Sequence, residues 1–136
     1  MTAMERGKKV VEIERFFRAL ADRTRLRVLN LLGDDEVCVC FLVEVLRMNQ
    51  PNISRHLAYL RRAGIVGARR EGKWMHYRVI VPSDPHAASV LRAVRAWLSE
   101  DKKMQRDRKR LTTVCCAPDM PIQLRSAPKP ASLGLG

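Results

Sequence analysis

The sequence lacks any apolar run that approaches the ~20 residues needed for a helix to span a bilayer, and residues 1–17 contain no apolar signal segment. We therefore expect no insertion into a membrane and a cytoplasmic location, where thiols stay reduced. Cysteine is also scarce, because the chain has only 4, arranged as Cys38/Cys40 and Cys115/Cys116. Neighbours this close seldom reach disulfide geometry without strain, so the pairs are interpreted as candidate ligands.

Acidic residues are much less frequent in this chain than basic residues. The 136 residues include 26 Lys and Arg against 14 Asp and Glu, which gives a formal net charge of +12. Such a balance favours a polyanionic partner, nucleic acid or an anionic membrane surface. The length and the 46% hydrophobic content suit one domain with a modest core.

Periodicity predicts five helices and one β-hairpin. Apolar residues recur at helical spacing in residues 10–21, 23–32, 41–48, 50–64 and 85–98. Asp22 is expected to cap the second helix, and Asn49 or Gln50 to start the fourth. The β-branched segment 36–40 predicts a brief strand that runs into the third helix.

The third and fourth helices are joined by a short connection, which predicts a helix-turn-helix. In residues 65–81 an alternating, strand-like pattern lies on both sides of Glu71-Gly72, which predicts a β-hairpin. The tip of this hairpin is basic, as expected for a wing that lies along DNA. The apolar stripe on the fifth helix suits a dimer interface. Residues 101–136 are expected to form a tail, first basic and flexible and then disordered, which carries Cys115 and Cys116.

Four segments, 19–32, 36–46, 49–66 and 69–79, resemble the ArsR/SmtB family of arsenic-responsive and zinc-responsive repressors. The resemblance covers roughly residues 10–98. It implies a mainly α-helical winged helix-turn-helix in residues 1–100 and a homodimer formed through the first and fifth helices. It further implies that the protein occupies operator DNA, represses a resistance operon and dissociates when a metal or metalloid binds.

The segment 36–40 carries the first candidate ligands. In an extended segment, residues two apart point to the same face, so Cys38 and Cys40 can converge on one thiophilic ion at a strand-to-helix junction. Trivalent arsenic or antimony takes three sulfur ligands, and the resemblance places the third at Val43, which cannot coordinate. Cys115 and Cys116 join this site, form a separate site or have no role. The alternative for Cys38 and Cys40 is simple burial in the core.

Other positions also depart from the family pattern. Arg23 replaces a frequent proline, and Phe41 replaces the aspartate usual in arsenic sensors. On the fifth helix Asp84, His86 and Glu100 match the family's zinc site, but the second histidine position is Trp97, which has no metal-binding lone pair. We therefore interpret Asp84 as a helix cap and His86 as an exposed first-turn residue.

The candidate DNA contacts divide by role. Amide, hydroxyl and guanidinium groups on the fourth helix can read base edges in the major groove, and basic residues there and on the hairpin can bind phosphates. The base-reading candidates are Gln50, Asn52, Ser54, Arg55, His56 and Tyr59. The phosphate candidates are Arg61, Arg62, Arg69, Arg70 and Lys73. The alternative for each arginine is a solvated surface charge.

The sequence contains no C-x-x-C motif and no catalytic base arranged near the thiols, so we expect neither an enzyme nor a catalytic cofactor. The predicted function is a repressor of double-stranded operator DNA, with trivalent arsenic or antimony as inducer. A thiol-redox or persulfide sensor of the same fold is one alternative. A non-specific nucleic-acid-binding protein is another.

Overall fold

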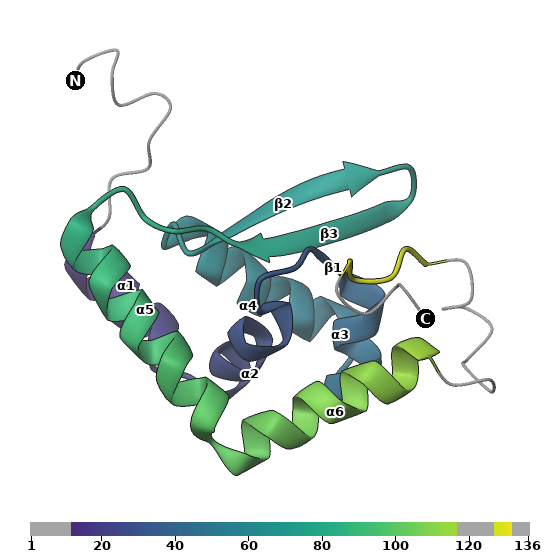
Figure 1. Cartoon of the computed structure of the whole chain (residues 1–136). Coiled ribbons are helices and arrows are strands. Elements are labelled where there is room, and N and C mark those ends of the chain that lie inside the picture. Colours follow the sequence, from purple (N-terminus) through teal and green to yellow (C-terminus); the bar gives the residue numbers. More distant parts are fainter. Residues whose placement is uncertain (1–11, 117–126, 132–136) are drawn as a thin grey trace.

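The computed structural model describes residues 12–116 and 127–131. Its elements are, in order, α1 (Ile13–Leu20), α2 (Arg23–Leu32), β1 (Val37–Cys38), α3 (Val39–Leu46), α4 (Gln50–Arg62), β2 (Val66–Glu71), β3 (Trp74–Val79), α5 (Pro85–Glu100) and α6 (Lys102–Cys116) (Figure 1). The strands form one antiparallel sheet in the order β1-β3-β2. The mainly helical fold with a hairpin is thus confirmed, and β1 adds a third strand to that hairpin. No helix in the described ranges is long and apolar enough to cross a bilayer.

Three of the helices predicted from the sequence begin at side chains that accept a hydrogen bond from the first turn. Asp22 Oδ1 accepts from the backbone N–H of Arg25 at 3.0 Å, and Asn49 Oδ1 accepts from that of Asn52 at 3.0 Å. Asp84 caps α5 in the same way. Each cap satisfies an amide that has no partner within its helix, so the predicted starts of α2, α4 and α5 are confirmed.

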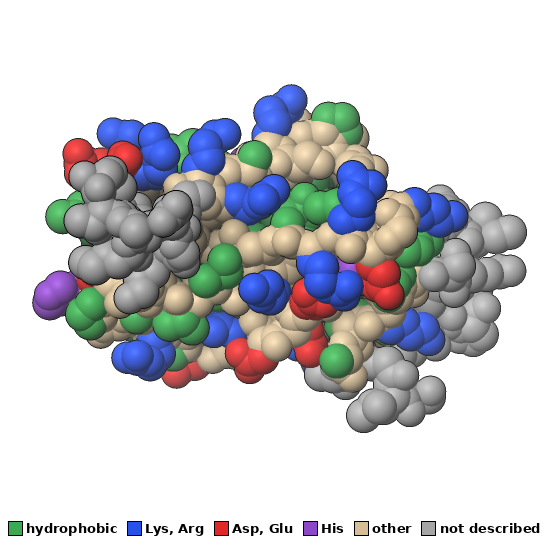
Figure 2. Space-filling view, turned by 90° about the horizontal axis from the view of Figure 1, so that it is seen from above, with side chains coloured by type: hydrophobic (Ala, Val, Ile, Leu, Met, Phe, Trp, Pro, Cys, Tyr) green, Lys and Arg blue, Asp and Glu red, His purple; other side chains and the backbone are tan. Residues whose placement is uncertain are grey.

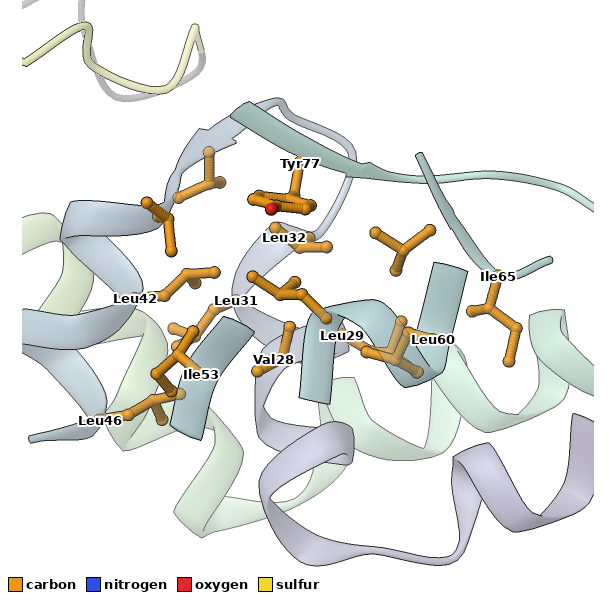
Figure 3. Packing of buried hydrophobic residues seen from close by; sticks show 14 of the residues in the cluster. Val28, Leu29, Leu31, Leu32, Leu42, Leu46, Ile53, Leu60, Ile65 and Tyr77 are labelled. Carbon is orange, nitrogen blue, oxygen red and sulfur yellow. The ribbon is translucent and has the colours of Figure 1, made fainter. Parts of the chain in front are cut away.

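The core lies between α2, α3, α4 and the inner face of the sheet (Figure 3). The buried faces of α2 and α3 meet the apolar stripe of α4, and Tyr77 of β3 packs over them. The residues that form this centre are Leu29, Leu31, Leu32, Phe41, Leu42, Ile53, Leu57, Leu60 and Ile65. Packing on both sides of the α3–α4 connection holds the two helices as one helix-turn-helix unit.

An apolar surface remains uncovered on α1 and α5, which occupy the same side of the molecule (Figure 1). Ile13 and Phe17 on α1 are 70% and 51% exposed, and Trp97 on α5 is 73% exposed. α1 instead turns Phe16 and Leu20 toward the core. The apolar face expected of the first helix, predicted over residues 10–21, therefore lies partly on the surface of a single chain. Residues 10 and 11 lie outside the described residues.

The expectation of a flexible basic stretch after residue 100 is wrong for residues 102–116, which form α6. Asp101 ends α5 and caps α6, because its Oδ2 accepts from the N–H of Met104 at 3.1 Å. Met104, Leu111 and Cys115 form a buried face on α6, and α6 contacts α2 and α3. The disorder expected for the last part falls mostly on residues 117–126 and 132–136, which lie outside the described residues.

Polar contacts fix α6 on α2. Arg27 donates from Nε and Nη2 to the two carboxylate oxygens of buried Asp107, at 2.7 and 3.0 Å, and this hydrogen bond raises the pKa of Arg27. Arg108 donates to the carbonyl of Leu31 at 2.9 Å. These long-range partners explain why a charged helix packs against the domain.

Candidate thiol site and nucleic-acid interface

Cys38 and Cys40, hereafter the cysteine pair, lie where β1 turns into α3. Cys38 has extended backbone and stands immediately before the first residue of α3, whereas Cys40 lies in the first turn of that helix. The Cys40 thiol donates to Cys38 Sγ with the two sulfurs 2.9 Å apart. The predicted position at a strand-to-helix junction is therefore confirmed, and the two side chains converge as expected.

The hydrogen bond between the two thiols shifts their pKa values in opposite directions. The hydrogen bond from Cys40 stabilises the Cys38 thiolate and lowers the pKa of Cys38 to about 7, although burial acts in the opposite direction. Donating that proton raises the pKa of Cys40 well above its ordinary range, and burial adds to the shift. At neutral pH about half of the Cys38 side chains are therefore thiolates, the form that binds soft metals and metalloids.

The other candidate ligands do not complete a three-ligand site with this pair among the described side chains. Cys115 is buried on α6, and the side chain of Cys116 lies outside the described part of the chain. Val43 is half-buried one turn after Cys40. Among the described residues, no three His, Cys, Asp or Glu side chains come together closely enough to hold a metal ion. The participation of Cys115 and Cys116 thus stays a prediction.

The α5 residues have the local roles expected of them. Asp84 Oδ1 accepts from the N–H groups of His86 and Ala87 at 2.8 and 3.2 Å, so it serves as the cap of α5. The His86 side chain is exposed in the first turn. Trp97 points outward, in the apolar surface described above.

α4 presents a polar surface opposite its buried stripe. Gln50 and Arg55 are exposed, while Asn52 and Ser54 are partly covered. Arg55 donates from Nη2 to the side-chain oxygen of Asn52, so this pair holds its polar groups together at the start of the helix. Arg61 and Arg62 are exposed in its last turn.

His56 and Tyr59 lie on the side of α4 that meets the start of α2. The guanidinium of Arg25 lies 3.3 Å from His56 Nδ1 and stacks 4.2 Å from the centre of the Tyr59 ring. Arg25 also donates to the carbonyls of Arg18 and Ala19. The surroundings of His56 and Tyr59 favour a role in orienting α4 against α2, and base contact by them stays a prediction.

The hairpin β2–β3, hereafter the wing, turns at Gly72, whose φ of +59° favours glycine. Arg70 and Lys73 are exposed near the turn, as predicted. Arg69 differs from them, because it forms an ion pair with Glu36 at 2.7 Å and lies 3.6 Å from Glu71. Seen from the wing side, Lys and Arg side chains spread across the surface (Figure 2).

Sequence reasoning missed Arg25, Glu36 and Asp107 as contributors to the site and its support. Their partners are separated from them by 31, 33 and 80 residues. No local pattern marks such pairs. The cap at Asp101 and the spacing of Met104, Leu111 and Cys115 were, by contrast, local signals for α6.

The arrangement of α3, α4 and the wing is that of a winged helix-turn-helix. A family model described as "Bacterial regulatory protein, arsR family" matches residues 22–67. The chain is 41% identical over 104 residues to the arsenical resistance operon repressor of Escherichia coli (strain K12), an alignment that covers 76% of this chain and 87% of that protein. The chain therefore belongs to the ArsR family of bacterial regulatory proteins.

Solved structures agree with this assignment. The AntR antimony-specific transcriptional repressor superposes with a TM-score of 0.53 at 30% identity, covering 77% of this chain and 86% of that chain. A homodimeric winged helix-turn-helix domain from Mycobacterium bovis gives a TM-score of 0.53 at 31% identity and covers 66% and 81%. The winged helix-turn-helix predicted from the sequence is thus confirmed.

Proposed function

We propose that the protein is a transcriptional repressor that binds operator DNA as a homodimer and is released when trivalent arsenic or antimony binds its cysteine thiolates. The observation that carries this proposal is the cysteine pair, with its sulfurs 2.9 Å apart at the entry to the helix-turn-helix. Similarity to an arsenical resistance operon repressor and to an antimony-specific repressor supports the choice of ligand. The role is regulatory, with the metalloid as inducer.

The cysteine pair offers two soft sulfur donors, one of which, Cys38, is about half ionised at neutral pH. A third sulfur comes from Cys115, from Cys116 or from an external thiol, since Val43 carries no donor. Cys115 is buried on α6.

DNA is read by α4 and held by basic side chains around it. Gln50, Asn52, Ser54 and Arg55 are proposed to contact base edges, because amide and guanidinium forks match the major-groove pattern. Arg62, Arg70 and Lys73 bind phosphates, which fix the position of the protein but carry no sequence information. The exposed apolar side chains of α1 and α5 pair two chains, so that two copies of α4 address a two-fold symmetric operator.

Release follows from the position of the cysteine pair. A metalloid atom inserted between the two sulfurs replaces their direct contact and disturbs the first turn of α3. Only residues 47–49 separate α3 from α4, and Arg47 in this connection has a left-handed backbone, with φ 55°. The disturbance therefore reaches α4, and ligand and DNA favour different conformations.

The experiment that tests this proposal is a release titration of the reduced protein on its operator with arsenite and with antimonite, using a random duplex as the control DNA. Cys38→Ser and Cys40→Ser should bind the operator and fail to dissociate when the ligand is added. The Cys115→Ser/Cys116→Ser variant should respond more weakly or to a different ligand. Normal release of the first two variants, with loss of release only in the third, would place the sensor on α6. Equal affinity for operator and random duplex would indicate a non-specific DNA-binding protein.

A thiol-redox repressor is the second candidate function, favoured by the lowered pKa of Cys38 and by the short distance between the two sulfurs. Hydrogen peroxide would oxidise the two thiols to one disulfide and would itself be reduced to two water molecules. Release by peroxide, reversed by a reducing dithiol, together with no response to arsenite would favour this function over the first.

A further inference from the structure

The strand that carries Cys38 belongs to the same sheet as the wing. β1 pairs with β3 at two positions, Val37 opposite Tyr77 and Cys38 opposite His76. β3 pairs along its whole length with β2, so β3 lies between the other two strands (Figure 1). A displacement of Cys38 therefore acts on the backbone of the wing as well as on α3.

A side-chain contact spans this sheet from β2 to the residue just before β1. Arg69 donates from Nε to both carboxylate oxygens of Glu36, each at 3.0 Å, and from Nη2 to Oε1 at 2.7 Å. Glu36 stands two residues before Cys38. The fork-shaped geometry distinguishes this ion pair from a loose surface contact. The pair thus ties the segment that leads to Cys38 to the outer strand of the wing.

A second carboxylate holds the pair in place. Glu71 lies 3.6 Å from the Arg69 guanidinium and accepts a hydrogen bond of 2.8 Å from Nε2 of His76, which is buried opposite Cys38. The hydrogen bond between Glu36 and Arg69 lowers the pKa of the carboxyl and raises that of the guanidinium. Arg70, the next residue, is exposed and forms no ion pair with any residue in the described ranges. Arg69 is therefore held against the sheet while Arg70 is available to DNA.

We propose that the Glu36–Arg69 ion pair is a positioning contact that passes ligand binding at the cysteine pair to the wing. This inference rests on the proposed function, because it requires both sulfurs to bind one metalloid atom. The inserted atom shifts the extended backbone of Cys38; Glu36 moves with it, and Arg69 draws the wing away from its DNA-binding position. Ligand and DNA then favour different wing positions, which is what release requires.

The test uses the full chain with Cys115 and Cys116 replaced by serine, as the parent protein. Phenylarsine oxide is the ligand, because its trivalent arsenic forms two As–S bonds with two thiols and releases one water molecule. Fluorescence anisotropy gives the operator dissociation constant with and without the arsenical, and their ratio is the coupling factor. The variants are Glu36→Gln, Arg69→Gln and the double variant, with Arg70→Gln as the matched control.

Both single variants and the double variant should lower the coupling factor by about threefold, because all three remove the same exposed ion pair. Arg70→Gln should weaken operator binding and leave the factor unchanged. Trp74 begins β3 beside the wing turn, and Lys73 lies 5.0 Å from its ring centre. The fluorine NMR signal of Trp74, in parent protein labelled with fluorotryptophan, should shift when the arsenical binds. The Glu36→Gln variant should lose most of that shift.

A parent-like coupling factor in Glu36→Gln, or single effects that add in the double variant, would refute the proposal. Failure of the proposed function has a different signature: the parent binds phenylarsine oxide, as mass spectrometry would show, yet stays on the operator. In that case the Trp74 signal alone tests whether ligand binding at the cysteine pair reaches the wing. A signal that does not move when the thiols are occupied refutes the transmission to the wing.

Discussion

Replacing Cys40 by alanine is expected to raise the pKa of Cys38, because a methyl group cannot donate the hydrogen bond that stabilises the Cys38 thiolate. With a pKa of about 7, about half of Cys38 is thiolate at neutral pH. An ordinary thiol pKa of about 8.5 leaves only about 3%. The thiolate population at neutral pH should therefore fall about fifteenfold, and burial acts in the same direction.

The assay is the ultraviolet absorbance of the thiolate, followed as the pH is raised, in a background with Cys115 and Cys116 replaced by serine. Cys40→Ser is the matched control, because its hydroxyl can still donate to Cys38 and should keep the pKa low. The reasoning would be refuted if Cys38 in Cys40→Ala titrated as it does in the parent. It would equally fail if the serine and alanine variants titrated together at the higher pH.

Two further predictions concern α6 and α5. Asp107→Asn should lower the free energy of unfolding by about 2 kcal/mol, because the buried fork to Arg27 loses its charge. Asp34→Asn, which removes a carboxylate that is 95% exposed, should change it by less than about 0.5 kcal/mol; urea denaturation compares the two, and equal stabilities would show that α6 docks without the pair. His86→Ala should leave any effect of zinc on operator binding unchanged, because Trp97 cannot coordinate a metal. A zinc response lost in His86→Ala titrations would contradict this.

The cysteine pair shows how far sequence reasoning reaches into the site. The i, i+2 spacing and the β-branched context predicted a strand-to-helix junction, and the backbone of Cys38 and Cys40 has that form. Which thiol donates to which follows from the environment of each sulfur, and so does the direction of each pKa shift. The direction of the hydrogen bond and of each pKa shift depends on burial and on nearby backbone groups, and the spacing of the cysteines in the sequence does not encode either.

Some features of the predicted DNA-reading helix, α4, likewise follow from the local sequence, and others depend on tertiary packing. Its start at Asn49 and its buried stripe are local features, since a cap and a helical period involve residues three or four apart. The same period placed His56 and Tyr59 on the polar side of α4. Tertiary packing brings Arg25 of α2 against both side chains, so their surroundings depend on a residue from another helix.

By itself the sequence determined the elements whose signals are local: the caps at Asp22 and Asp84, the turn at Gly72 and the apolar periods of the helices. Hydrogen bonds and side-chain periods of a few residues carry that information whatever the rest of the chain does. Only the tertiary structure decided that β1 joins the wing, that Arg69 binds Glu36 and that α6 packs on α2 through Arg27 and Asp107. Partners tens of residues apart meet because the core positions their backbones, and side-chain charge alone does not select among several equivalent partners in the sequence.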